Sequence, residues 1–333
     1  MKIALIGSPE SGKDDLFFVL SEGKTSKIKN ELIGTAIVKD ERVEKLSKAF
    51  NPKKTTYIQI NFISPDFTQS LPIEELRISD EIVYVVKCYS SYEGENIDPL
   101  KTLSGIDLSF KINDIEIIEN YISKHKKEPD SEKEVSILEK LKTDIEENKF
   151  IKDTVILKNS IIKGLGLISL KPKLIVLNIS EDMISGNPYY EKLKKEFPNY
   201  EFVNISVELE KELLSLNEDE RSELLKAYGI AESGLNLFVK SSYKLLDLIT
   251  FFTVGEDEVR AWTLRKNSTA FDAAGKIHSD IQRGFIKAEV INYEEFLKLN
   301  FSFKEAKDKG LLRLEGKDYI VQDGDIVHIR FHV

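Results

Sequence analysis

The sequence lacks the features of an exported, disulfide-bonded or membrane-spanning protein. Cys88 is the only cysteine among 333 residues, so no disulfide can form within the chain, and a cytoplasmic location is expected. No apolar stretch approaches the roughly 20 residues of a membrane-spanning helix, so no membrane partner is expected. The opening apolar run stops at Gly7, too short for an export signal, and is predicted to be a buried first strand.

Surplus positive charge is also missing. The formal net charge is −9, which argues against a general coat for nucleic acids. The charge is uneven, because residues 251–333 carry almost as many basic as acidic side chains, so local basic stripes can exist there. With 41% apolar and 32% charged residues, the composition is typical of a soluble globular protein. The length predicts two or three domains, and we expect a monomer.

The first ninety residues and residues 166–250 have the pattern of an α/β domain. Short β-branched and aromatic runs alternate with amphipathic stretches, and an amphipathic helix is predicted at about 233–249. The predicted buried strands are residues 2–6, 33–38, 57–63, 81–87, 174–178 and 201–205. Continuous apolar strands that alternate with helices predict a mostly parallel sheet covered on both faces.

Residues 98–165 predict a helical hairpin inserted in this domain. Apolar residues recur at helical spacing in its first half, at Leu108, Ile112, Ile115, Ile118 and Ile122. After a polar, basic turn, Ser131 and Glu134 form a capping-box pattern that starts a second helix. The apolar stripe of that helix is Val135, Leu138, Leu141 and Ile145. The two helices are predicted to pack as an antiparallel coiled coil, with the turn as a solvated tip or a contact site.

From residue 251 onward the sequence is rich in strands and turns. Residues 259–264 alternate between apolar and polar, and residues 322–325 (Gln-Asp-Gly-Asp) predict a tight turn. In the last strand, one face is expected to carry Val327, Ile329, Phe331 and Val333, and the other His328, Arg330 and His332. We predict a small α+β domain built on a curved sheet.

The strongest chemical signal is the segment Gly7-Ser8-Pro9-Glu10-Ser11-Gly12-Lys13-Asp14. It follows a predicted buried strand and precedes a predicted helix. In that setting the Gly-x4-Gly-Lys spacing is typical of a phosphate-binding loop, because the glycines let the backbone wrap a phosphate and the lysine neutralises charge. The alternative is a chance turn that contains glycine.

Asp14 departs from this motif. The loop normally ends in Ser or Thr, whose hydroxyl binds Mg²⁺. An aspartate puts a carboxylate beside the β- and γ-phosphates, and two unit charges about 4 Å apart repel by roughly 4 kcal/mol at an effective dielectric constant near 20. Asp14 would then weaken triphosphate binding, unless it binds the metal itself. Asp15, next to it, is predicted to be a first-turn carboxylate favoured by the helix dipole.

The last third of the chain contains five distinctive segments, at residues 251–255, 258–263, 273–280, 283–291 and 314–325. These segments closely resemble the C-terminal TGS domain of the YchF proteins, a branch of the Obg-related nucleotide-binding proteins. The resemblance extends over the whole chain. It implies a P-loop nucleotide-binding domain at 1–97 and 166–250, the helical hairpin at 98–165 and a TGS domain at 251–333. It also implies ATP or GTP as ligand and contact with ribosomes or RNA.

The resemblance implies a base-binding role for residues that follow two predicted strands. Asn178 and Glu181 lie where guanine-specific relatives carry Asn-Lys-x-Asp; the YchF family carries Asn-x-x-Glu there, which accompanies a preference for ATP over GTP. An asparagine amide can pair with the N6 and N7 edge of adenine. Ser206 matches the last base-contacting loop of the family more loosely. For Asn178 and Glu181 the alternative is an ordinary turn at the end of a strand.

Other parts that the resemblance implies are missing. The family's Asp-x-x-Gly would begin at Asp66, but Gln69 stands in place of the glycine. The two switch segments, at 24–32 and 71–76, are shortened. Because phosphoryl transfer depends on positioning and on metal-assisted charge stabilisation, we expect little hydrolysis and assign no catalytic residue.

We therefore expect a regulatory protein that binds ATP or GTP weakly, with impaired hydrolysis, and contacts a ribosome or RNA. The candidate contact surface is Arg260 with His328, Arg330 and His332, although a solvated sheet face has the same pattern. Two alternatives remain. One is a slow ATPase or GTPase in which Asp14 binds Mg²⁺, and the other is an interaction scaffold that has lost its nucleotide.

Overall fold

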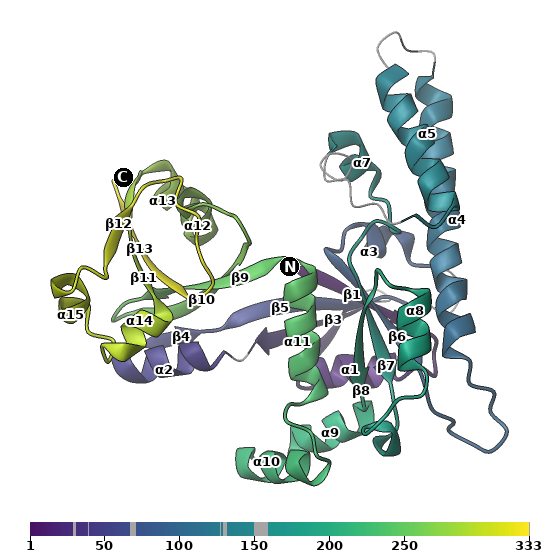
Figure 1. Cartoon of the computed structure of the whole chain (residues 1–333), viewed down its shortest axis with the longest axis horizontal. Helices are drawn as coiled ribbons and strands as arrows, with labels where there is room; N and C mark the ends of the chain where they lie inside the picture. Colours follow the sequence, from purple (N-terminus) through teal and green to yellow (C-terminus); the bar gives the residue numbers. More distant parts are fainter. Residues whose placement is uncertain are drawn as a thin grey trace. The chain divides into compact units, whose positions relative to one another are not determined.

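The chain forms two compact units, each organised around its own β-sheet (Figure 1). The structure is a computed structural model that describes residues 1–28, 31–38, 40–66, 71–126, 128, 132–149 and 159–332. Unit 1 comprises Met1–Thr35 and Asn61–Ser242, and unit 2 comprises Ala36–Ile60 and Tyr243–Val333.

Unit 1 is built on a seven-stranded sheet with the strand order β2-β3-β5-β1-β6-β7-β8. The strands are β1 (Lys2–Gly7), β2 (Thr25–Ile28), β3 (Glu31–Val38), β5 (Ile58–Ser64), β6 (Glu81–Lys87), β7 (Lys173–Asn178) and β8 (Glu201–Ile205). Neighbours from β5 to β8 are parallel, and β2 and β3 form an antiparallel hairpin at one edge. The central strands β1, β6 and β7 are buried along almost their whole length, as expected for a sheet covered on both faces. The mostly parallel sheet predicted from the sequence is confirmed.

The helices of unit 1 connect these strands. They are α1 (Lys13–Leu20), α3 (Ile73–Arg77), α4 (Pro99–His125), α5 (Glu132–Glu146), α7 (Ser160–Leu165), α8 (Tyr190–Glu196), α9 (Val207–Ser215), α10 (Glu218–Ala227), α11 (Gly234–Leu245, which ends in unit 2) and the short 3₁₀ helix η1 (Glu181–Met183). Helix α11 is shorter than predicted, because Ile249 belongs to strand β9 and packs in the core of unit 2. Among the residues that the structure describes, no helix combines the length and the apolarity needed to cross a bilayer.

The predicted helical hairpin is present, with α4 and α5 side by side (Figure 1). The predicted stripe of α5 is buried as expected, whereas the stripe on α4 is partly wrong, because Leu108 and Ile112 are 57% and 56% exposed. The first half of α4 packs against the sheet through Leu103, Ile106 and Phe110. The predicted positions Ile115, Ile118 and Ile122 pack with α5, and Ile118 is fully buried there. The buried face therefore includes positions outside the predicted repeat. Ser131, the predicted cap of α5, lies outside the described residues.

Unit 2 contains a six-stranded sheet with the order β12-β11-β13-β9-β10-β4. Its strands are β4 (Lys54–Thr56), β9 (Leu248–Val254), β10 (Glu258–Arg265), β11 (Phe285–Asn292), β12 (Arg313–Glu315) and β13 (Asp325–Phe331). Its helices are α2 (Glu41–Phe50), α12 (Ala270–Ile277), α13 (Ser279–Arg283), α14 (Tyr293–Lys298) and α15 (Phe303–Asp308). Buried residues on both faces of the sheet form two cores. The predicted α+β fold and the turn at 322–325, where Gly324 has φ 85°, are both present.

Residues 36–60 cluster with unit 2, although the sequence placed them in the nucleotide-binding part. Strand β4 pairs in parallel with β10, with Thr55 opposite Val259. In helix α2, Val43 and Leu46 are fully buried in the core that contains Phe252. The chain passes between the units after residues 35, 60 and 242, so unit 2 is assembled from two separate segments of sequence.

Candidate functional site

The segment with the phosphate-binding spacing forms a tight loop between β1 and α1. Gly7 ends the strand, and Gly12 caps the helix in the left-handed conformation at φ 82°. The loop is closed by Ser11, whose amide and hydroxyl both donate to Ser8 O, at 3.0 and 2.7 Å. At Gly7 an added Cβ would lie 2.5 Å from Ser11 Oγ, so only glycine fits without movement. The strand–loop–helix setting that the motif requires is therefore present.

Lys13 is only 8% exposed, and its ammonium group already has an anion. Its Nζ donates to Asp14 Oδ1 at 2.6 Å and to Ser64 Oγ at 2.7 Å. The Asp14 side chain itself is 66% exposed. In a phosphate-binding loop this ammonium group contacts the β- and γ-phosphates. A phosphate at this loop must therefore compete with the Asp14 carboxylate for the lysine.

The residue at the end of β5 that faces the loop is Ser64, which the sequence analysis did not single out. It is buried, 3% exposed, and its hydroxyl contacts Lys13. Asp66, the predicted start of an Asp-x-x-Gly motif, is exposed beyond the end of the strand, and Gln69 lies outside the described residues. P-loop NTPases hold Mg²⁺ with an aspartate on a neighbouring strand as well as with the loop hydroxyl. At this strand end the chain offers a hydroxyl in place of that carboxylate.

Asn178 lies against the loop, as its predicted role requires, but both ends of its amide are engaged. The side chain is 2% exposed at the end of β7. Its Nδ2 donates to Ser11 O at 2.9 Å, and its Oδ1 accepts from Val207 N at 3.3 Å. A Cβ on Gly12 would overlap Nδ2. Asn178 therefore ties the loop to β7 and α9, and pairing with adenine would require it to release one of these bonds.

The other two predicted base-contacting residues also have partners within the protein. Glu181, in η1, accepts a hydrogen bond from the Tyr228 hydroxyl, which raises the pKa of that tyrosine. Ser206 is the N-cap of α9, and its Oγ accepts from Leu209 N at 3.4 Å. A cap of this kind explains Ser206 without a ligand.

The rim of the loop is acidic and exposed. Pro9 and Glu10 point to solvent, and Asp15 forms an ion pair with Lys211 of α9, at 3.1 Å. Lys211 could not be identified from the sequence, because it reaches the loop only through the packing of α9 on α1. Within the described part of the chain, no group of three or more His, Cys, Asp or Glu side chains is placed to hold a metal ion. Among the described residues, Asp14 therefore has no second and third acidic, His or Cys side chain with which to hold a metal ion.

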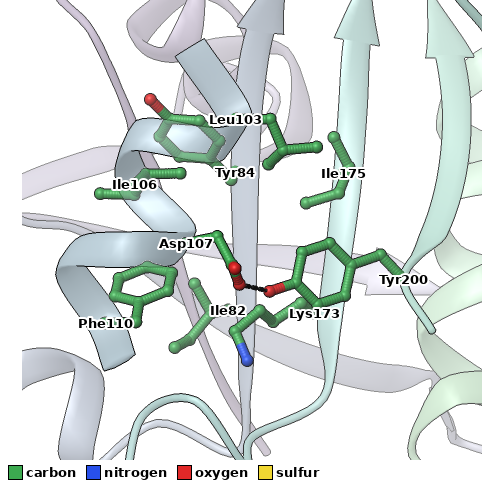
Figure 2. Close-up of a pocket in the computed structure, with 9 residues that line it drawn as sticks. All are labelled: Ile82, Tyr84, Leu103, Ile106, Asp107, Phe110, Lys173, Ile175 and Tyr200. Carbon is green, nitrogen blue, oxygen red and sulfur yellow. Dashed lines mark hydrogen bonds between the residues drawn. The ribbon is translucent and has the colours of Figure 1, made fainter. Parts of the chain in front are cut away.

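A second buried polar cluster lies at the opposite, amino-terminal edge of the same sheet. Figure 2 shows Asp107 of α4 accepting a hydrogen bond from the Tyr200 hydroxyl, with Lys173 beside them. Burial lowers the pKa of Lys173 to about 8, and its Nζ donates to the backbone oxygens of Ser169 and Lys171, at 2.7 and 3.2 Å. The cavity that these side chains line has no room for a water molecule. The cluster therefore attaches α4 to the sheet and is not a ligand site.

The predicted RNA-contacting residues of unit 2 do not form one surface. Arg260 is opposite Thr253 on β9, and its guanidinium lies 3.8 Å from the ring centre of Trp262, on the face that packs with Phe251. His328 and Arg330 are exposed on the other face of the sheet, where Arg330 forms an ion pair with Glu289. The alternation predicted for the last strand holds for Val327 and Ile329, which are buried, whereas Phe331 is 42% exposed. Val333 lies outside the described residues, and His332 is exposed just after the strand.

Comparison with protein families and with curated sequences gives concordant results. The family named YchF-GTPase_C, described as a protein of unknown function (DUF933), matches residues 248–332. The ribosome-binding ATPase YchF of Bacillus subtilis is 34% identical over 361 aligned positions, which cover 99% of this chain and 98% of that protein. The ribosome-binding ATPase YchF of Haemophilus ducreyi is 32% identical, and the alignment covers 100% of this chain and 99% of that protein.

Solved structures also match along the whole chain. The YchF GTPase of Schizosaccharomyces pombe superposes with a TM-score of 0.85 at 26% identity, and covers 99% of this chain and 97% of its own. A GTP-binding protein from Pyrococcus horikoshii has a TM-score of 0.65 at 20% identity and covers both chains completely, which shows a shared fold. Both units thus have counterparts in a single solved chain.

Proposed function

The chain belongs to the YchF family, and we propose that it binds ATP weakly through the loop of residues 7–14, hydrolyses it slowly or not at all, and contacts the ribosome or RNA through unit 2. The observation that carries this proposal is the position of Lys13 between the Asp14 carboxylate and the Ser64 hydroxyl. The lysine that a phosphate needs is in place. The groups around it are not those that hold Mg²⁺ in other P-loop proteins.

The fit of a magnesium nucleotide to these residues is partial. The left-handed Gly12, the tight loop and Lys13 suit the phosphates, because they present backbone amides and a positive charge. Magnesium would supply charge neutralisation between the phosphates when bound. The Asp14 carboxylate can act in two ways. It can repel the phosphates, or it can bind Mg²⁺ directly, because Mg²⁺ prefers hard oxygen ligands. Because Asp14 bonds Lys13, repulsion is the outcome that the geometry favours.

ATP is the proposed nucleotide on two grounds. The bacterial relatives at 34% and 32% identity are named ATPases, whereas the solved relative from Schizosaccharomyces pombe is named a GTPase. Recognition of guanine needs a carboxylate that accepts from two N–H groups of the base. The carboxylate at position 181, Glu181, already accepts a hydrogen bond from Tyr228, which makes it less suited to that role. Asn178 would support the loop in either case.

Titration of the full-length protein with ATP, GTP and ADP, each with and without Mg²⁺, tests the nucleotide proposal. We expect binding of ATP in the range of tens of micromolar to millimolar and phosphate release close to the uncatalysed background. Lys13→Ala should abolish binding, with the exposed Lys195→Ala as the control for loss of one lysine charge. Absence of binding at millimolar nucleotide would favour the scaffold alternative. Rapid phosphate release that Asp14→Ala removes would favour the ATPase alternative.

For the ribosome or RNA, we propose the face with Arg260 and Trp262 as the contact. The guanidinium stacks on the indole, which holds its charge and its planar group in place for a phosphate or a base. Arg330 is paired closely with Glu289, whereas the Glu258 carboxylate lies 3.9 Å from the Arg260 guanidinium, a weaker ion pair. Relatives named ribosome-binding support a ribosomal partner. In cosedimentation with ribosomes, Arg260→Glu should reduce the bound fraction more than Arg330→Glu; the reverse order would move the contact to the other face.

A further inference from the structure

Unit 2 contains a pocket that none of the proposed nucleotide-contacting or RNA-contacting residues lines. Its volume is about 340 Å³, and its polar lining consists of Asn292, Glu295, Arg313, Tyr319, Gln322 and Asp325. These residues come from the end of β11, from α14, from β12 and from the turn that precedes β13. All of them belong to unit 2, so the pocket does not depend on how the two units are arranged.

Asp325 is the buried acceptor of this pocket. It is 1% exposed, and its Oδ2 accepts from the Tyr319 hydroxyl and from Gln322 N, both at 2.8 Å. Its Oδ1 is shielded from water and has no hydrogen-bond partner among the residues that the structure describes. Buried acceptors in native proteins are almost always bonded, because an unpaired one loses its hydration without compensation. An unpaired oxygen on a residue that lines a pocket points to a donor supplied from outside, which must displace the atoms that shield this oxygen.

The charge of the pocket selects the kind of donor. Glu295 adds a second, half-buried carboxylate, for which the described residues provide no ion pair. The guanidinium of Arg313 already lies over the Tyr319 ring, 5.2 Å from its centre, donates to the Tyr319 hydroxyl at 2.9 Å and pairs with Glu315 at 3.5 Å. The charge left without a partner is therefore negative.

We propose that this pocket binds a basic side chain of a protein partner, with an arginine guanidinium as the best match. A guanidinium is planar, always charged and has five N–H donors, so it can satisfy Asp325 Oδ1 and pair with Glu295 at the same time. An unpaired RNA base could also donate to Asp325, but its phosphates would come close to Glu295 and Glu315 and be repelled. The arginine side chain thus fits the charge as well as the donors.

Titration of the full-length protein, isotopically labelled for nuclear magnetic resonance, with an acetylated Gly-Arg-Gly amide tests this proposal. We expect shifts of the Gly310 and Tyr319 signals, and at least tenfold weaker binding of the same peptide with citrulline in place of arginine. Citrulline keeps the shape and loses the charge. Equal affinity for the two peptides would overturn the proposal, and so would a single-stranded RNA hexamer that shifts these signals when the arginine peptide does not.

A matched pair of variants on α14 isolates the electrostatic contribution. Glu295→Gln should weaken binding of the arginine peptide about tenfold, whereas Glu294→Gln, the next residue on the same helix and exposed to solvent, should leave it unchanged. Asp325→Asn should abolish binding, because the amide would present a donor where the unpaired acceptor stands. Thermal unfolding checks that each variant is folded. If Asp325→Asn unfolds, the Glu295 and Glu294 pair decides alone, and equal affinities in that pair would overturn the proposal.

Discussion

The two edges of the seven-stranded sheet each bury a lysine, and they differ in the partners that surround it. At the carboxyl edge, Lys13 is bonded by the exposed carboxylate of Asp14 and by the hydroxyl of Ser64 at the end of β5. At the amino edge, Lys173 is bonded by two backbone oxygens and lies over the rings of Phe110 and Tyr200. One lysine has partners that a ligand can replace, and the other has partners that are part of the fold.

This difference separates a binding group from a structural one. Moving the Asp14 side chain into solvent removes the carboxylate from Lys13 and leaves the sheet intact. Freeing Lys173 would require the connection between α4, Tyr200 and β7 to open, since its neighbours are fixed by the main chain. Burial of an ionisable group is therefore a poor guide to function by itself, and the exchangeability of its partners is a better one.

The largest effect that tests this comparison is expected at Gly12. In Gly12→Ala the new Cβ would overlap the Asn178 amide and would sit at a positive φ. We predict that nucleotide binding falls by about 100-fold or more, because the loop must move to relieve the overlap. Gly94→Ala is a matched control, since φ is 89° there and nothing lies within 4 Å of the added Cβ. Equal affinities in the two variants, measured by calorimetry, would show that the loop geometry does not control binding.

A smaller effect, on stability, is expected at the amino edge from Glu81. Burial raises the pKa of Glu81 to about 8 from 4.5, and its Oε1 accepts from Ser242 Oγ at 2.9 Å. The folded protein thus keeps a proton that the unfolded chain loses, so this contribution to stability is complete below pH 4.5 and is lost as the pH rises through 8. We predict that the free energy of unfolding falls by a few kcal/mol between pH 5 and 8.

Chemical denaturation over this range of pH measures the effect. In Glu81→Gln the fall should flatten, because the amide keeps the bond from Ser242 and cannot ionise. The exposed Glu74→Gln should leave the profile of the parent unchanged. If Glu81→Gln kept the same slope as the parent, another group would be responsible.

The smallest effect is expected at Lys173, with the opposite sign. Its pKa is lowered to about 8 from 10.5, so the unfolded chain holds a proton that the folded protein has lost between these values. The free energy of unfolding should therefore rise between pH 8 and 10, by about 2 kcal/mol. In Lys173→Met this rise should disappear, whereas the exposed Lys195→Met should retain it. Nucleotide affinity should be the same in both variants, and a loss in Lys173→Met would contradict the separation of the two edges.

The parts that could be predicted from the sequence are those governed by local pattern. The mainly apolar runs at 81–87 and 201–205 coincide with β6 and β8, because strands covered on both faces bury apolar side chains at successive positions. The loop of residues 7–14 was identified because its glycines and lysine follow a strand directly. The role of Ser64 could not be predicted, because the Asp-x-x-Gly motif of the family points to Asp66. Only the packing of β5 beside β1 brings Ser64 to Lys13.

Features that depend on pairing between distant segments could not be predicted. Arg260 and Arg330 both stand at polar positions of alternating strands, but the register of β9 with β10 and of β13 with β9 puts them on opposite faces. Residues 36–60 read as a continuation of the first α/β pattern, and their helix joins unit 2 only because Val43 and Leu46 complete its core. A single sequence contains no local signal for either arrangement.

The competition between Asp14 and phosphate for Lys13 is the central claim, and one measurement tests it most directly. The dissociation constant of Mg-ATP is to be compared by calorimetry between the parent chain and Asp14→Ser, which restores the hydroxyl and removes the carboxylate. We predict at least tenfold tighter binding in Asp14→Ser, about 1.4 kcal/mol or more. Unchanged binding in that variant would contradict the claim, and weaker binding would also indicate that Asp14 binds the metal.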